Sequence, residues 1–408
     1  MMTRKHSPLA LGLTLLASLC SAGTGCSSDM KPGEVGEELG FNESSLNAPE
    51  ERFEREEDGQ GDNDAEGGIA AAMVHHPSGN PVFVTAARRV DNFLGVSAFY
   101  SGQAALAPDE YTSITAVGPD VDIAPVGMEP RVVVAVTNAT GKLTLIQYKV
   151  DAGNNQRQLS RMFSFETGVQ TNASRKVEIA SVRWQSGPIV MTSVINESGN
   201  LQLNTWKVSD AAIEPLDVET AGSITDVVLA GDADNETAAT ATFNSAGEVR
   251  LILWSTDWAG NITRKLDGFR DIGSAAQVAI SLQSNRLSVA QRTSSNLLLK
   301  AYDASFLGSG SIQPVDTHTL SATSRVAIDD HAGRMIVALR TLSGNLKLIA
   351  FERANGVLTR ITDNELDNAP AGSVTLFDLV SSDEILFTGS NGNASLDVKG
   401  IVWRYFHY

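Results

Sequence analysis

The chain has 408 residues, of which 42% are hydrophobic and 19% are charged, a composition typical of globular proteins rather than of chains that stay disordered throughout. Its 31 basic and 48 acidic side chains leave a formal net charge of −17. This balance argues against a nucleic-acid partner, because such partners are bound mainly by lysine and arginine side chains that neutralise phosphates.

The N-terminal residues are typical of an export signal. Arg4 and Lys5 precede an apolar stretch, residues 9–19. This stretch is too short to span a bilayer as a helix but has the length of the hydrophobic region of a signal peptide. We therefore predict a signal peptide over residues 1–25.

The end of this signal carries a recognisable motif. The sequence Gly23-Thr24-Gly25-Cys26 resembles a bacterial lipobox, in which small residues precede a cysteine that is lipidated and becomes the mature N-terminus. The resemblance implies lipidation at Cys26 and a lipid anchor as the only attachment to a membrane of the bacterial cell envelope, in the outer membrane or facing the periplasm. Ordinary signal cleavage nearby is the alternative. The only other cysteine, Cys20, lies in the removed segment, so the mature chain has no thiol for a disulfide.

A strongly acidic segment follows the signal. Between Lys31 and Gly68 there are thirteen acidic residues against Lys31, Arg52 and Arg55. So dense a run of like charge buries too little apolar surface to offset its ordering entropy. We therefore predict a disordered acidic tether over residues 26–67.

The rest of the chain contains an internal repeat. An aliphatic residue is followed five positions later by an aromatic one in seven places, usually directly after a Gly-containing turn that is typical of β-hairpins. The seven pairs are Leu94 and Phe99, Leu143 and Tyr148, Leu201 and Trp206, Val249 and Trp254, Leu297 and Tyr302, Leu346 and Phe351, and Val398 and Trp403.

A second feature lies about 25 residues before each aromatic residue. It is a short strand pattern that begins with one residue followed by two small or aliphatic ones, as in Glu178-Ile179-Ala180. The unit therefore contains an inner strand, a hairpin and a polar fourth strand, and it repeats about every 49 residues, the size of a propeller blade. We predict an all-β fold, a seven-bladed β-propeller of four-stranded blades over residues 68–408, with the aromatic residues packed between neighbouring sheets.

The pattern leaves the last blade one strand short. The sequence ends after the third strand of that blade, and Arg52 to Arg55 is the only mixed apolar and basic stretch in the acidic segment. This stretch either supplies the missing strand or leaves an unpaired outer edge.

The hairpins Gly199-Asn200-Leu201-Gln202-Leu203 to Trp206 and Gly344-Asn345-Leu346-Lys347-Leu348 to Phe351 are similar to those of exported bacterial repeat-propeller lipoproteins. The resemblance extends over nearly the whole mature chain. It implies a propeller architecture.

The first residues of the inner strands form the candidate ligand-binding site. In a propeller these residues and the hairpin turns share one face, at the mouth of the central channel, where we expect Asp122, Glu178, Asp226, Gln277 and Arg325 to form a ring. Neighbouring carboxylates raise one another's pKa unless a cation or a donor compensates them. Such a ring accepts hydrogen bonds from sugar hydroxyls or binds Ca²⁺; the alternative is a set of solvated strand ends.

No catalytic set is assembled in the sequence. It lacks a nucleophile elbow, a phosphate loop and a dinucleotide fingerprint, so we predict neither catalytic residues nor a cofactor beyond the Ca²⁺ just named. The expected function is non-catalytic recognition of a glycan or protein ligand. An extracellular polysaccharide hydrolase and a scaffold subunit of an envelope complex are the alternatives.

Overall fold

The predicted repeats form β-strands, and the described residues contain no helix. The computed structural model describes residues 52–61, 65–75, 81–89, 91–100, 109–127, 130–153, 156–184, 187–304, 312–331, 333–354, 357–366, 375–378, 384–390 and 398–406. Residues 49–408 belong to one compact unit. The part of the chain that the structure describes holds no candidate membrane-spanning helix.

The strands pair antiparallel with their neighbours in sequence. The first two blades share one sheet: β2 (Ala65–His75), β3 (Pro81–Arg89), β4 (Phe93–Tyr100), β5 (Asp109–Pro125), β6 (Arg131–Asn138), β7 (Lys142–Gly153) and β8 (Gln156–Gln170). The third blade is β9 (Val177–Arg183), β10 (Ile189–Ile195), β11 (Asn200–Val208) and β12 (Ile213–Ser223). The fourth is β13 (Asp226–Asp232), β14 (Thr237–Phe243), β15 (Glu248–Thr256) and β16 (Ile262–Ser274).

The remaining sheets repeat this arrangement. The fifth blade is β17 (Gln277–Gln283), β18 (Arg286–Arg292), β19 (Asn296–Ala304) and β20 (Ile312–Ser321). The sixth is β21 (Thr323–His331), β22 (Arg334–Thr341), β23 (Leu346–Ala354) and β24 (Val357–Leu366). The last sheet is β25 (Thr375–Asp378), β26 (Glu384–Ser390), β27 (Val398–Phe406) and β1 (Arg52–Gly61).

Strand β5 serves two blades. Its first part pairs with β4, and its second part, from Val117 onward, pairs with β6. It is therefore the outer strand of one blade and the inner strand of the next. With β5 divided in this way, the sheets of the described chain correspond one to one with the predicted repeats.

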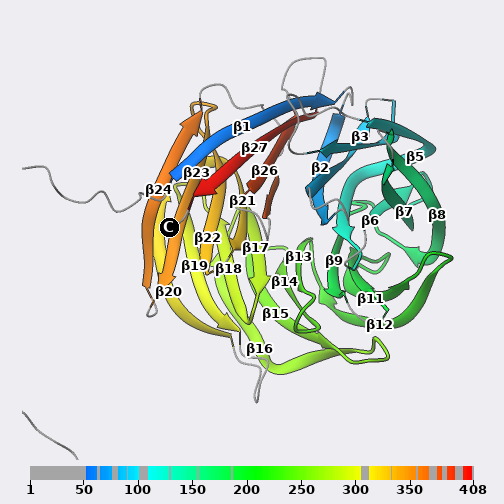
Figure 1. Ribbon diagram of the computed structural model, residues 1–408. Coiled ribbons are helices and arrows are strands. Elements are labelled where there is room, and N and C mark those ends of the chain that lie inside the picture. Colours follow the sequence, from blue (N-terminus) through cyan, green and yellow to red (C-terminus); the bar gives the residue numbers. More distant parts are fainter. Residues whose placement is uncertain are drawn as a thin grey trace, which may run out of the picture. The chain divides into compact units, whose positions relative to one another are not determined.

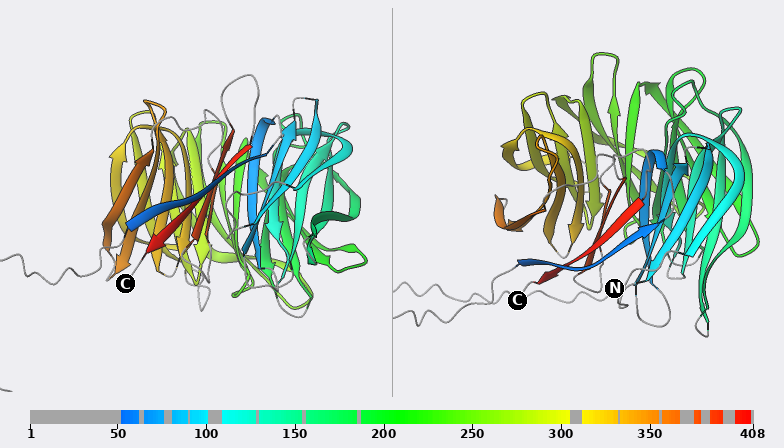
Figure 2. Two further views of the ribbon diagram at one scale, coloured as in Figure 1. Left: turned by 45° about the horizontal axis from the view of Figure 1, so that its top comes forward. Right: turned by 90° about the horizontal axis from the view of Figure 1, so that it is seen from above.

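The last blade is completed by the N-terminal strand. β1 pairs antiparallel with β27, with Arg52 opposite Phe406 and Gly61 opposite Val398, and Figure 2 shows the blue β1 beside the red β27. The tether predicted over residues 26–67 therefore requires a correction at residues 52–61, which form a strand. In addition, β2 begins at Ala65, before the predicted boundary at residue 68.

The inner strands form a closed ring. Contacts between neighbouring inner strands run from β2 through β5, β9, β13, β17 and β21 to β25, and β25 contacts β2 again. Figure 1 shows the blades following one another around this ring in sequence order. The propeller fold predicted from the repeat is confirmed.

The core consists of apolar clusters between adjacent blades. Tyr148, Trp206, Trp254, Tyr302 and Phe351 are at most 3% exposed. Each packs in the cluster that its blade shares with the preceding blade. The buried indole N–H groups keep a partner, since Trp206 Nε1 donates to Thr192 Oγ1 at 2.9 Å and Trp254 Nε1 donates to Thr240 Oγ1 at 3.0 Å. The predicted role of the aromatic repeat is confirmed for these five blades.

Candidate functional site

The inner strands all begin on one face of the propeller, here called the first face, and end on the second face. Asp226 at the start of β13 pairs with Phe243 at the end of β14, directly before the hairpin turn in which Gly247 has a φ of 76°. The strand starts and these turns therefore share the first face, as the sequence predicts. Successive residues of an inner strand alternate between the channel and the sheet interfaces.

A basic residue that the sequence analysis did not single out lies among the acidic residues of the first face. Lys176 Nζ is 2.5 Å from Glu178 Oε1 and 3.3 Å from Asp120 Oδ2. Burial lowers the pKa of Lys176, but the carboxylates of Glu178, Asp120 and Asp226 outweigh it and raise this pKa well above its usual value. Lys176 precedes Glu178 by two residues, so the period of a strand places both on one face.

Asp122 is held by backbone donors. Ile179 N–H donates to its Oδ2 at 2.7 Å, and Ile123 N–H donates to its Oδ1 at 2.9 Å. Burial raises the pKa of Asp122 well above its usual range, and the neighbouring Glu178 carboxyl adds to the effect. Burial also raises the pKa of Glu178 to about 7, although Lys176 acts in the opposite direction.

The other three ring residues do not line the central cavity. Asp226 Oδ1 accepts a hydrogen bond from Val227 N–H at 2.8 Å, and burial raises its pKa. Gln277 Nε2 donates across to Val326 O in the next blade at 3.3 Å, and Arg325 is exposed. Of the five predicted ring residues, Asp122 and Glu178 line the cavity, and a ligand site made by all five stays a prediction.

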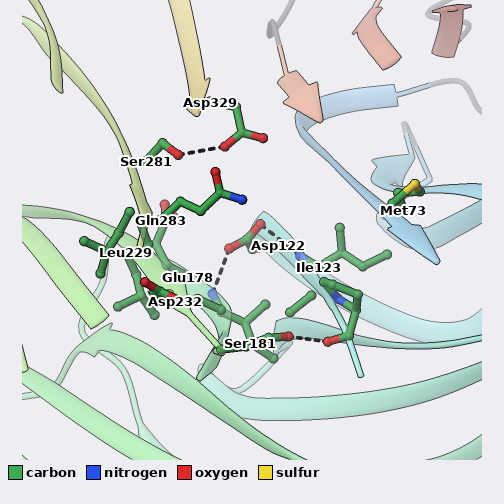
Figure 3. A pocket seen from close by; sticks show the side chains of 18 of the residues that line it. Met73, Asp122, Ile123, Glu178, Ser181, Leu229, Asp232, Ser281, Gln283 and Asp329 are labelled. Carbon is green, nitrogen blue, oxygen red and sulfur yellow. Dashed lines mark hydrogen bonds between the residues drawn. The ribbon is translucent and has the colours of Figure 1, made fainter. Parts of the chain in front are cut away.

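The central cavity has a volume of about 340 Å³. Residues of β2, β5, β9, β13, β17 and β21 line it, with apolar side chains such as Met73, Leu229 and Ile280 beside the polar ones. Figure 3 shows Asp122, Gln283 and Asp329 pointing into the same space from three different blades. The polar lining residues are Asp122, Glu178, Ser181, Trp184, Asp232, Asp234, Ser281, Gln283, Asp329 and Asp330.

A second acidic group lies toward the second face. Ser281 Oγ donates to Asp329 Oδ1 at 2.7 Å and accepts from Asp330 N–H at 3.1 Å. Burial raises the pKa of Asp329 to about 6 and that of Asp330 to about 7. Ser281 and Asp329 were not predicted from the sequence, although each follows a predicted ring residue, Gln277 or Arg325, by four positions and so shares its side of the strand.

These acidic groups are not arranged as a metal centre. Within the described residues no group of three or more histidine, cysteine, aspartate or glutamate side chains is placed to hold a metal ion. The suggestion of Ca²⁺ therefore gains no support there. Cys26, the predicted lipidation site, lies outside the described residues.

Comparisons with known proteins bear on the fold. No family model matches the chain, and no curated protein matches it. A solved structure from Lactobacillus plantarum has a TM-score of 0.52 at 15% identity, over 73% of this chain and 87% of that one. A candidate 6-phosphogluconolactonase from Bacteroides uniformis has a TM-score of 0.52 at 12% identity, over 72% of this chain and 88% of that one.

A lectin is also among the similar structures. The Aleuria aurantia lectin in complex with α-methyl-L-fucoside has a TM-score of 0.45 at 12% identity, over 74% of this chain and 96% of that one. At such a score the likeness supports no conclusion about this chain. The two higher-scoring structures support the propeller fold and, at their low identity, nothing further.

Proposed function

We propose that this protein is a lipid-anchored propeller of the bacterial cell envelope that binds a glycan through its central cavity. The observation that supports this proposal is the composition of the cavity, where carboxyl groups, two serines and an amide lie beside apolar side chains such as Met73 and Leu229. Sugars present hydroxyl donors at their edges and C–H groups on their faces, so they need both kinds of partner. A volume of about 340 Å³ suits a small molecule or the terminal units of a chain rather than a protein surface.

The charge of the cavity disfavours a phosphorylated substrate. None of the described residues that line it is lysine or arginine, and phosphate groups are normally bound by such side chains. The cavity is therefore poorly suited to a phosphosugar lactone, the class of substrate that the name of the Bacteroides uniformis protein indicates.

A glycan array probed with the full chain, purified in detergent, tests the proposal. We expect binding to at least one class of glycan, and we expect Asp122→Asn to weaken it at least tenfold. Asp271→Asn is the matched control, since Asp271 pairs with Arg250 on the exposed surface of the fourth blade. Absence of binding to any glycan on the array would count against the cavity as the binding site. Equal binding by Asp122→Asn and the parent chain would do the same.

The raised pKa of Glu178, about 7, favours a glycoside hydrolase as the second candidate, because glycosidases use a carboxylic acid that stays protonated as the general acid. A fluorogenic glycoside panel separates the two candidates. Turnover that disappears in Glu178→Gln would establish the hydrolase, and binding without turnover supports the non-catalytic function.

A further inference from the structure

Three polar side chains converge in the central cavity from blades that are distant in sequence. Asp122 comes from β5, Gln283 from the end of β17 and Asp329 from β21, and Figure 3 shows their polar groups directed toward one another. Each oxygen of Asp122 accepts one backbone N–H, which leaves capacity for a further donor because a carboxylate has about four lone-pair positions. The amide of Gln283 makes no hydrogen bond to any described residue.

The cavity carries an excess of acidic groups. Six of its lining residues are acidic, namely Asp122, Glu178, Asp232, Asp234, Asp329 and Asp330. Glu178 has Lys176 as its ion-pair partner. Among the described residues no lysine or arginine lies within salt-bridge distance of Asp122, Asp232 or Asp330.

Asp330 follows Asp329 in β21 and faces the neighbouring blade. It is only 7% exposed, and its Oδ1 accepts from Ser288 Oγ at 2.9 Å, whereas its Oδ2 has no hydrogen-bond partner in the described part of the chain. Arg353 and Arg286 act on it only through space, together with the like charge of Asp329. Asp330 is therefore turned toward β18, and its free oxygen does not face Asp122, Gln283 and Asp329.

The acidic lining of the cavity favours some classes of sugar over others. A uronic acid would place its carboxylate against the acidic lining. A neutral sugar would donate hydroxyls but offer no positive charge to these acidic groups. An ammonium group offers three donors and a positive charge, which match two carboxylates and one amide oxygen.

We propose that the glycan bound in the cavity carries a protonated amino group, that is, an amino sugar without an N-acetyl group, held between Asp122 and Asp329 beside Gln283. This inference rests on the proposed glycan-binding function and adds the chemical class of the ligand. The apolar side chains of Met73, Leu229 and Ile280 then contact the C–H faces of the sugar.

Calorimetric titration of the full chain at pH 7 with three matched trisaccharides tests the inference. They are the β-1,4-linked trimers of glucosamine, N-acetylglucosamine and glucose, which differ only in the substituent at C2 of each ring. We expect the glucosamine trimer to bind at least tenfold tighter than the other two. Equal or weaker binding of the glucosamine trimer overturns the inference but leaves the glycan-binding function intact if another glycan binds on the array. Failure of every glycan overturns both.

Variants then locate the ammonium group. Asp329→Asn should weaken binding of the glucosamine trimer at least tenfold, and the exposed Asp271→Asn should not change it. Gln283→Lys is a second test that disturbs no hydrogen bond among the described residues, and it should abolish binding because it places a like charge beside the amine. Unchanged binding in a folded Gln283→Lys chain would overturn the placement.

Discussion

At the scale of single residues, Gly231 lies where β13 packs against β9. A Cβ atom at this position would lie 2.2 Å from Ser181 O and 3.0 Å from Ala180 Cβ. The first of these atoms belongs to the backbone, so the two inner strands would have to separate. We expect Gly231→Ala to lower the free energy of unfolding by about 1–3 kcal/mol, measured by urea denaturation.

Gly222 provides the control for this change. It lies in β12, where an added Cβ atom would meet no other atom within 4 Å, and its φ is not positive. Gly222→Ala should therefore leave the urea midpoint nearly unchanged. Equal midpoints for the two variants would show that β9 and β13 are not packed as closely as the structure has them.

The buried carboxyl of Glu178 makes stability depend on pH. Burial raises its pKa from 4.5 to about 7, so between these values the folded chain binds a proton that the unfolded chain has lost. Stability from this group is present below pH 4.5 and is lost as the pH rises through 7. We expect Glu178→Gln, which cannot ionise, to gain about 1–3 kcal/mol over the parent chain between pH 4.5 and pH 8, measured by urea denaturation at each pH.

The comparison is made against Glu214→Gln, since Glu214 is exposed on the outer strand β12. This variant should follow the pH profile of the parent chain. If the Glu178→Gln profile also runs parallel to that of the parent chain, Glu178 does not titrate in this range.

At the scale of elements, the aromatic repeat determines how neighbouring blades pack. Trp254 is 0% exposed in the cluster between the third and fourth blades, whereas Trp258, in the turn that follows the same strand, is 72% exposed. Trp254→Ala should lower the free energy of unfolding by about 3–5 kcal/mol, because it removes buried apolar area and leaves a cavity. Trp258→Ala should change it far less. Comparable losses in denaturation curves would contradict the assigned packing.

The pairing of β1 with β27 is testable by cross-linking. Glu54 lies opposite Arg404, and antiparallel partners are close enough for a disulfide. In a chain with Cys20 and Cys26 replaced by serine, Glu54→Cys with Arg404→Cys should form a disulfide on oxidation, detected as a mobility shift on a non-reducing gel. Glu54→Cys with Val398→Cys should not, because Val398 lies opposite Gly61. The reverse result would exclude this register.

At the scale of the whole molecule, closing the propeller requires both ends of the described chain. β1 and β27 lie in one sheet although they are separated by every other blade. The predicted lipidation site at Cys26 therefore precedes a strand of the ring, and the predicted spacer between them is limited to the residues before Arg52.

The predicted anchor gives a cellular expectation. Mass spectrometry of the membrane fraction should find diacylglycerol on Cys26, and Cys26→Ser should release the protein from that fraction. The physical reason is that acyl chains contribute about 0.8 kcal/mol for each buried CH₂ group, whereas no other attachment is predicted. An unlipidated mature N-terminus at a different residue would contradict the proposed anchor.

The sequence by itself determined the repeat, the strand order within each blade and the aromatic residues between blades. These follow from patterns of two and about 49 residues, which are properties of the local chain. It also placed Asp122 and Glu178 together on one face, since the repeat predicts each of them at the start of an inner strand.

Only the tertiary structure decided how the ring closes and which side chains share the cavity. β1 is acidic enough to be taken for a spacer, and its partner β27 lies at the other end of the chain. Asp122, Gln283 and Asp329 meet because three blades present their inner strands to one channel. Such contacts depend on the closed packing of all the blades, and no local pattern encodes them.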